Sequence, residues 1–181
     1  MTHWTLEDRF LTLATHWVSL VGEHYTDHRG QRLEYYRAER SDSVIVLPVQ
    51  ENTLLCAQRS FRPGIGESTL DFPGGRIGDQ SPEEAARRIL SRELGLDPDA
   101  LRELALLNQR GWPVDSSFSD QRLYGAVARL HPEASPEDAG ERFPLTPEGQ
   151  ARLLRELECA QCRLVLLHFL RATGGMENGS L

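Results

Sequence analysis

Apolar and polar positions along the chain follow a pattern that predicts a mixed α/β domain. The run Ser43–Val49 is rich in β-branched residues and favours a buried strand. Two extended segments, 17–25 and 33–39, flank a turn-rich stretch at 26–31, which predicts a hairpin. Further strands are expected at 53–61, 69–72, 104–109 and 123–130.

Helix signals are strongest after the glycine-rich stretch 73–80. Ser81 is a typical N-cap, Pro82 suits the first helical position, and Gly95 marks the end, so a helix is expected up to about Leu94. Three more helices are expected, at 5–16 with Thr5 as N-cap and Asp8 three residues later, after Thr146-Pro147-Glu148, and over 162–171. We find no repeat or linker. We therefore expect one domain over 1–181, with 1–40 as an N-terminal helix/hairpin extension and 174–181 as a flexible tail.

Charge and composition narrow the class of protein. The chain has 181 residues and a net charge of −7, which argues against nucleic acid as a partner. No apolar run is long enough for a membrane span, so no membrane partner is expected. The residues after Met1 do not resemble a signal peptide, which favours the cytoplasm. All 20 basic residues are arginine, which excludes a phosphate-loop or Schiff-base lysine.

The cysteines favour a structural role. Cys56, Cys159 and Cys162 are an odd, small set that fits a reducing compartment. Cys159-Ala-Gln-Cys162 has CxxC spacing, but neither a second pair nor suitably spaced histidines lie near it in the sequence. Structural thiols are therefore the favoured interpretation, with redox or metal chemistry as the alternative.

The segment 69–96 runs in the order strand, Gly74-Gly75, capped helix, Gly95-Leu96. Loop amides in such an arrangement approach an anionic ligand closely. Carboxylates at helical spacing beside them hold divalent cations. This order resembles the Nudix hydrolase box, G-x5-E-x7-R-E-U-x-E-E-x-G-U, where U is aliphatic. The resemblance implies an α/β (α+β) fold, a Nudix-type α/β/α sandwich with a mixed sheet and an N-terminal β extension.

The resemblance covers about residues 17–172 and is closest to the ADP-ribose and nucleotide-sugar pyrophosphatases of the family. It rests on Arg59–Pro63, on Thr69–Gly75, on Pro113 and on Ser117–Asp120. It implies an ADP-ribose-like nucleoside diphosphate derivative as partner. It also implies a homodimer, since strands that cross to the partner in that subfamily are apolar here, with Trp17, Val18, Leu20, Val21, Tyr35 and Tyr36.

The box is degenerate in this chain. The loop before Ser81 is one residue short, and Arg88 keeps the box arginine. The acidic positions are mostly replaced: they carry Gln80, Ile89, Arg92 and Glu93, and the loop glutamate of the subfamily falls on Gln121 beside Asp120. Positions 89, 92 and 93 share one helical face, so an isoleucine, a cation and one carboxylate stand where the family gathers carboxylates around Mg²⁺ or Mn²⁺.

The resemblance assigns candidate residues to roles. Glu93 and Asp120 are the catalytic candidates, and Glu93 is the metal ligand. The substrate-binding candidates are Arg62, Gly74, Gly75, Arg88, Arg92 and Phe118. Arg92 either takes the place of the metal against a diphosphate or pairs with a nearby acid.

Three functions stay open at this point. The first is binding of a nucleoside diphosphate derivative with weak or no metal-dependent hydrolysis, because metals polarise the phosphoryl oxygens in that reaction. The second is an active pyrophosphatase with Mg²⁺ or Mn²⁺ held by acids outside the box, such as Glu133, Glu137, Asp138 and Glu141. The third is a protein-interaction or ligand-sensing module. The cofactor is accordingly Mg²⁺ or Mn²⁺, or none, and the enzyme class is a Nudix diphosphatase by resemblance only.

Overall fold

A computed structural model describes residues 3–174. The chain divides into two compact units. The first contains the residues up to Asp42 together with Trp112–Arg122, and the second contains Ser43–Gly111 and the chain from Leu123 onward. No helix in the described part of the chain is long and apolar enough to cross a membrane.

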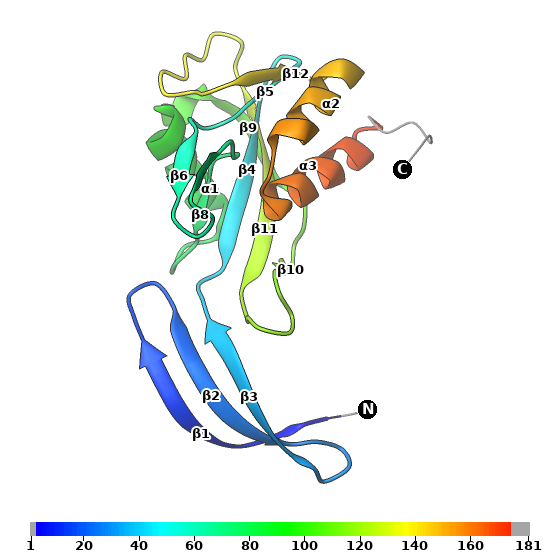
Figure 1. Ribbon diagram of the computed structural model, residues 1–181. Helices are drawn as coiled ribbons and strands as arrows, with labels where there is room; N and C mark the ends of the chain where they lie inside the picture. The colour runs from blue at the N-terminus through cyan, green and yellow to red at the C-terminus, as the bar shows by residue number, and fades with distance from the viewer. Residues whose placement is uncertain (1–2, 175–181) are drawn as a thin grey trace. The chain divides into compact units, whose positions relative to one another are not determined.

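The first unit is built on an antiparallel sheet in the order β1-β2-β3 (Figure 1). Its strands are β1 (Thr5–Ala14), β2 (Ser19–Thr26) and β3 (Arg32–Glu39), and the short β10 (Trp112–Pro113) belongs to the same unit. The expected β2–β3 hairpin is confirmed. Its turn is stabilised by Asp27, whose carboxylate accepts hydrogen bonds from the N–H groups of Arg29 and Gln31, and by Gly30 at φ +78°.

The helix expected at 5–16 is wrong, because this segment is strand β1. Thr5 and Asp8 have the spacing of a helix N-terminus, and this local signal is the basis of the helix expected from the sequence. Strand β1 pairs with β2 over its whole length, from Thr5 opposite Thr26 to Ala14 opposite Ser19. This pairing provides hydrogen-bond partners for the backbone N–H and C=O groups of β1. Long-range pairing has overridden the local capping signal.

A buried ion cluster links the three strands of this sheet. Glu23 on β2 is fully buried. Its carboxylate accepts hydrogen bonds from Arg9 Nη2 on β1 at 2.7 Å and from Arg37 Nε on β3 at 2.8 Å, and also from the Tyr25 hydroxyl at 2.9 Å. The hydrogen bonds from Arg37, and then those from Tyr25 and Arg9, outweigh burial and lower the pKa of Glu23 to about 2.

The second unit contains a mixed sheet. Strand β11 runs parallel to β4 and antiparallel to β9, while β4 pairs antiparallel with β5 and β8, and β5 with β12. The bounds are β4 (Ser43–Gln50), β5 (Thr53–Leu55), β8 (Gly74–Arg76), β9 (Leu101–Leu106), β11 (Arg122–Leu130) and β12 (Arg142–Pro144). A separate hairpin consists of β6 (Ser60–Arg62) and β7 (Glu67–Thr69).

Helices cover both faces of this sheet. They are α1 (Pro82–Leu94), α2 (Pro147–Glu156) and α3 (Ala160–Ala172), with a 3₁₀ turn at Pro98–Ala100. Val44 and Val46 of β4 pack in one core with α1. Successive side chains of a strand point to opposite faces, so the buried Ile45 and Leu47 face the other side, and α3 contacts β4 (Figure 1). The expected α/β/α sandwich with a mixed sheet is confirmed.

Several boundaries differ from the sequence prediction. The strand expected at 53–61 is broken into β5 and β6, and the loops expected at 73–80 and 131–144 contain β8 and β12. Strand β8 forms in a glycine-rich stretch because Gly74 lies close to β4: a Cβ there would be 3.3 Å from both Ile45 Cγ1 and the Val44 carbonyl oxygen. Of the tail expected at 174–181, all but Gly174 lies outside the described residues.

Candidate active site

Helix α1 begins and ends as its sequence predicts. The Ser81 hydroxyl accepts a hydrogen bond from the Glu84 N–H at 3.2 Å, and the Glu84 carboxylate accepts one from the Ser81 N–H at 2.8 Å. Gly95 ends the helix with φ +64°. The apolar face of α1 is buried against the sheet, which fixes the direction in which the last turn presents Arg92 and Glu93.

The last turn of α1 contacts the Gly74-Gly75 strand. Glu93 Oε2 accepts a hydrogen bond from the Gly74 N–H at 3.2 Å, and Arg92 Nη2 donates to the Gly74 carbonyl oxygen at 3.2 Å. Arg92 Nη2 also forms an ion pair with Glu93 Oε1. A Cβ on Gly75 would lie 3.3 Å from Arg92 Nη2 and 3.3 Å from Ile89 Cδ1, so a larger residue there would require these two side chains to shift by a few tenths of an ångström.

The structure thus brings together Gly74, Gly75, Arg92 and Glu93 among the candidate site residues, with Ile89 beside them. Ile89 is fully buried and belongs to the apolar core. Arg92 has the acid partner that the sequence offered as one of its two alternatives.

The donor set does not fit the divalent metals of the Nudix box. Glu93 is the single carboxylate among positions 89, 92 and 93, and both of its oxygens already accept hydrogen bonds. Mg²⁺ requires near-octahedral oxygen coordination and binds weakly through few protein ligands. The Arg92 guanidinium lies where it would repel such an ion. We therefore derive no hydrolytic step through a metal at this site.

Arg92 keeps hydrogen-bonding capacity for a ligand. Both of its contacts use Nη2, and its Nε and Nη1 make no hydrogen bond within residues 3–174. Its side chain is 53% exposed. A guanidinium presents donors in a planar fork that matches phosphate oxygens. The site therefore offers a cation to an anionic ligand beside the Gly74-Gly75 backbone.

Arg88 stabilises the loop that precedes α1. Its Nε donates to Gln80 Oε1 at 2.7 Å and its Nη2 to the Arg76 carbonyl oxygen at 2.9 Å. The two residues that the sequence resemblance aligns with the box arginine and the first box glutamate, Arg88 and Gln80, are therefore in contact. With two protein acceptors on its guanidinium, Arg88 positions the loop.

Arg62 at the end of β6 is held by a carboxylate. Its Nε and Nη2 donate to Asp71 Oδ2 at 3.0 and 2.5 Å, and its Nε also contacts Thr69 Oγ1. Asp71 is buried, while the side chain of Arg62 remains half-exposed. A phosphate- or ribose-binding role of Arg62 remains a prediction.

Asp120 and Phe118 belong to the other unit. Asp120 Oδ1 accepts a hydrogen bond from the Arg40 N–H at 2.9 Å, and the Phe118 carbonyl oxygen accepts one from Ala38 at 2.7 Å. Gln121 is buried and donates from Nε2 to the Ser41 carbonyl oxygen at 3.0 Å. In the first unit these residues hold the 112–122 loop to the chain around β3.

The acidic loop after β11 reaches the end of α1. The Asp138 N–H donates to the Leu94 carbonyl oxygen at 3.4 Å, and Asp138 Oδ2 lies 3.2 Å from the place that a Gly95 Cβ would occupy. Glu141 instead pairs with Arg59 at 2.9 Å. The sequence analysis named four acids of this loop as possible metal ligands outside the box. Of these, Asp138 lies at the C-terminus of α1.

Comparison with known proteins identifies the family. The family model of the NUDIX domain matches residues 39–158, which is well over half of the chain. The chain belongs to the Nudix family. Enzymes of this family generally use divalent metals such as Mg²⁺ or Mn²⁺.

Two relatives refine this result. The chain is 35% identical over 91 residues to the mouse (Mus musculus) ADP-sugar pyrophosphatase, a match that covers 44% of this chain and 42% of that protein. The crystal structure of an ADP compounds hydrolase superposes with a TM-score of 0.78 at 22% identity, covering 96% of this chain and 97% of the other. The likeness to the ADP compounds hydrolase shows the fold. The match to the ADP-sugar pyrophosphatase spans less than half of that protein.

Proposed function

We propose that this chain binds a nucleoside diphosphate derivative of the ADP-ribose type and hydrolyses it weakly or not at all. The observation that carries the proposal is the position of Arg92, ion-paired to Glu93 and hydrogen-bonded to Gly74 on the box face. The names of the two relatives, an ADP-sugar pyrophosphatase and an ADP compounds hydrolase, support this class of ligand.

Each residue of the site has a role in such binding. The Arg92 guanidinium donates from Nε and Nη1 to diphosphate oxygens while Nη2 stays on Gly74. Glu93 holds the Gly74 N–H and neutralises part of the Arg92 charge. Arg88 fixes the loop, and Arg62, half-exposed, supplies a second cation. The set provides charge for binding, but it provides neither a metal cluster nor a base to activate water.

Replacing Arg92 is expected to weaken binding in the absence of metal. In Arg92→Glu, a charge-assisted hydrogen bond is lost and a repulsive carboxylate takes its place, so the affinity for ADP-ribose in EDTA should fall by about 10–100-fold. With Mn²⁺ part of that affinity should return, because the carboxylates at positions 92 and 93 can then bind the cation together. Isothermal titration calorimetry of both proteins measures this change.

Arg87→Glu is the matched control, because Arg87 is exposed on another face of the same helix and the charge change is identical. It should bind as the unmodified protein does. If Arg92→Glu also binds unchanged in EDTA, Arg92 does not contact the ligand. If the unmodified protein binds no diphosphate at all, a protein-interaction function becomes the better interpretation.

We also propose that the chain forms a homodimer through its N-terminal sheet. Strand β1 is exposed over its whole length. Large apolar side chains of this region are exposed in one copy of the chain: Leu6, Phe10, Leu11, Leu13, Trp17, Val18 and Tyr36. A region of a chain that exposes many large apolar side chains is typical of a protein–protein interface.

Light scattering at micromolar concentration is expected to report twice the 20.4 kDa chain mass. Leu13→Glu should shift the species toward the monomer, because Leu13 is 59% exposed and a buried charge at an interface is costly. Leu164→Glu, an exposed leucine of α3 in the other unit, should leave the dimer intact. A monomer-sized species in the unmodified protein would contradict the proposal.

A further inference from the structure

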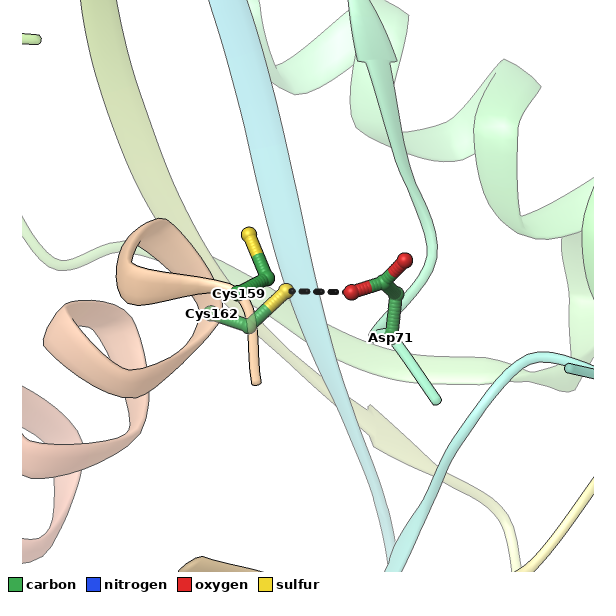
Figure 2. Close-up of side chains that lie close together, drawn as sticks. All are labelled: Asp71, Cys159 and Cys162. Carbon is green, nitrogen blue, oxygen red and sulfur yellow. Dashed lines mark hydrogen bonds between the residues drawn. The ribbon is translucent and has the colours of Figure 1, made fainter. Parts of the chain in front are cut away.

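Two cysteines and a carboxylate that are distant in sequence meet in the second unit. Cys162 Sγ lies 3.7 Å from Asp71 Oδ1, and the ligand atoms of Asp71, Cys159 and Cys162 all lie within 4.8 Å of one another (Figure 2). Asp71 and Cys162 are buried, and Cys159 is partly exposed. In the described part of the chain, this is the one group of histidine, cysteine or acidic side chains with the spacing of a metal site.

The backbone holds the two segments together. Asp71 follows β7, and its carbonyl oxygen accepts a hydrogen bond from the Ala57 N–H at 3.0 Å. Leu70 bridges to Leu157, two residues before the N-cap of α3. Cys159 is that N-cap, and Cys162 lies one turn further along α3. The geometry therefore rests on regular structure and does not depend on a flexible loop.

The two oxygens of Asp71 have different surroundings. Oδ2 accepts hydrogen bonds from the Thr69 hydroxyl at 2.8 Å and from the Arg62 guanidinium. Oδ1 is directed to Cys162 and accepts a hydrogen bond from its thiol, which is a weak donor. Carboxylates that bind metals are commonly oriented by such partners on the other oxygen. Thr69 and Arg62 thus fix Asp71 so that Oδ1 faces the two sulfur atoms.

The one sulfur-to-oxygen distance that is defined in this group is compatible with a thiolate-bound zinc ion. In a tetrahedral zinc site, with Zn–S of about 2.3 Å and Zn–O of about 2.0–2.2 Å, the sulfur-to-oxygen edge is about 3.5 Å. The observed 3.7 Å between Cys162 Sγ and Asp71 Oδ1 is close to this edge. Thiolate ligands select Zn²⁺ and disfavour Mg²⁺ and Mn²⁺, so such a site differs in chemistry from the box.

Metal binding requires the thiolate form of both cysteines. A metal ion at this position would displace the Cys162 proton and compensate the buried negative charge.

We propose that Asp71, Cys159 and Cys162 form a site for Zn²⁺ or a similar thiolate-binding divalent cation, with a water molecule as fourth ligand. The ion would tie the start of α3 to the segment after β7. The three metal ligands are not part of the proposed box site; Arg62, which orients Asp71 here, is the one residue that both proposals use.

Cobalt is the probe, since Co²⁺ adopts zinc sites and its thiolate bonds absorb in the near ultraviolet. Titration of the reduced full-length chain should give one equivalent of Co²⁺ with a thiolate-to-cobalt band, and Zn²⁺ should abolish the band. Cys159→Ser should weaken the band strongly. Asp71→Asn should keep a sulfur band but lower the affinity for Co²⁺ at least about tenfold. Cys56→Ser is the control, since Cys56 lies outside the cluster and burial raises its pKa to about 12.

Three results would overturn the proposal. The first is no charge-transfer band with excess Co²⁺. The second is an unchanged affinity in Asp71→Asn, which would leave only two sulfur ligands. The third is a combination of two observations: Cys159 and Cys162 form a disulfide by exchange with a small disulfide compound, and the reduced protein takes up no metal. The two cysteines would then be a redox-active pair. Circular dichroism of each variant confirms folding, and the partly exposed Cys159 gives the least disruptive substitution.

Discussion

ADP-ribose mixed with this protein and Mn²⁺ is expected to be cleaved far more slowly than about 1 s⁻¹, an ordinary lower value for enzymes. The site has one carboxylate, Glu93, which is already engaged with Gly74 and Arg92. Loss of a single group that acts in the transition state typically costs about 10²–10³-fold, and several box acids are replaced here. Colorimetric phosphate release with a coupling phosphatase measures the rate.

The controls for this assay come from the same helix and loop. Arg92→Glu should not restore turnover, because Ile89 stays in the core and supplies no ligand. If the unmodified protein turns over faster than about 1 s⁻¹ and Asp138→Asn abolishes this, the acid beside Gly95 has replaced the missing box ligands. The active-pyrophosphatase interpretation would then be correct.

Glu23→Gln is expected to lower the free energy of unfolding of the N-terminal sheet by about 3–5 kcal/mol, the usual cost of breaking a buried ion pair from one side. The substitution leaves Arg9 and Arg37 with one anionic partner fewer at the centre of β1–β3. Hydrogen exchange of the backbone amides in these strands measures the effect. Glu34→Gln on β3 is the control, because Glu34 is exposed and should change stability by less than about 0.5 kcal/mol.

The same carboxylate predicts a dependence of stability on pH. The pKa of Glu23 is held at about 2 in the folded chain, below the reference value of 4.5. A lowered pKa contributes stability above the unfolded value, and this contribution is lost as the pH falls through the folded value. Protection of β1–β3 should therefore decline between about pH 4.5 and 2 in the unmodified protein. In Glu23→Gln this part of the decline should be absent.

Helix α1 and its site could be predicted because their determinants are local. Ser81, Pro82 and Gly95 specify the ends of the helix, and a period of 3.6 residues then places positions 89, 92 and 93 on one face. The structure confirms both ends of the helix. The partner of Arg92 could not be predicted, because a sequence does not show whether a guanidinium pairs with its neighbour or with a ligand.

Prediction from the sequence fails where contacts between distant segments determine the structure. Strand β1 carries a helix-like start, yet its pairing with β2 and the Arg9–Glu23 contact exist only in the folded sheet. Structural thiols stay the favoured interpretation of the CxxC segment from sequence, because neither a second cysteine pair nor suitably spaced histidines lie near it, and the carboxylate beside it could not be found in this way. Asp71 lies 88 residues before Cys159 in the sequence, and the Leu70–Leu157 bridge helps to bring the two segments together. The sequence around Asp71, two residues before Pro73, does not indicate that this carboxylate lies beside the two cysteines.

The central claim, that Arg92 serves in place of a metal at the box, is tested most directly by calorimetric titration of the unmodified protein with ADP-ribose, once in EDTA and once with excess Mn²⁺. The account predicts binding in EDTA, with an affinity that Mn²⁺ does not increase, because the cation that the diphosphate requires is already part of the chain. Binding that appears only when Mn²⁺ is present would contradict it.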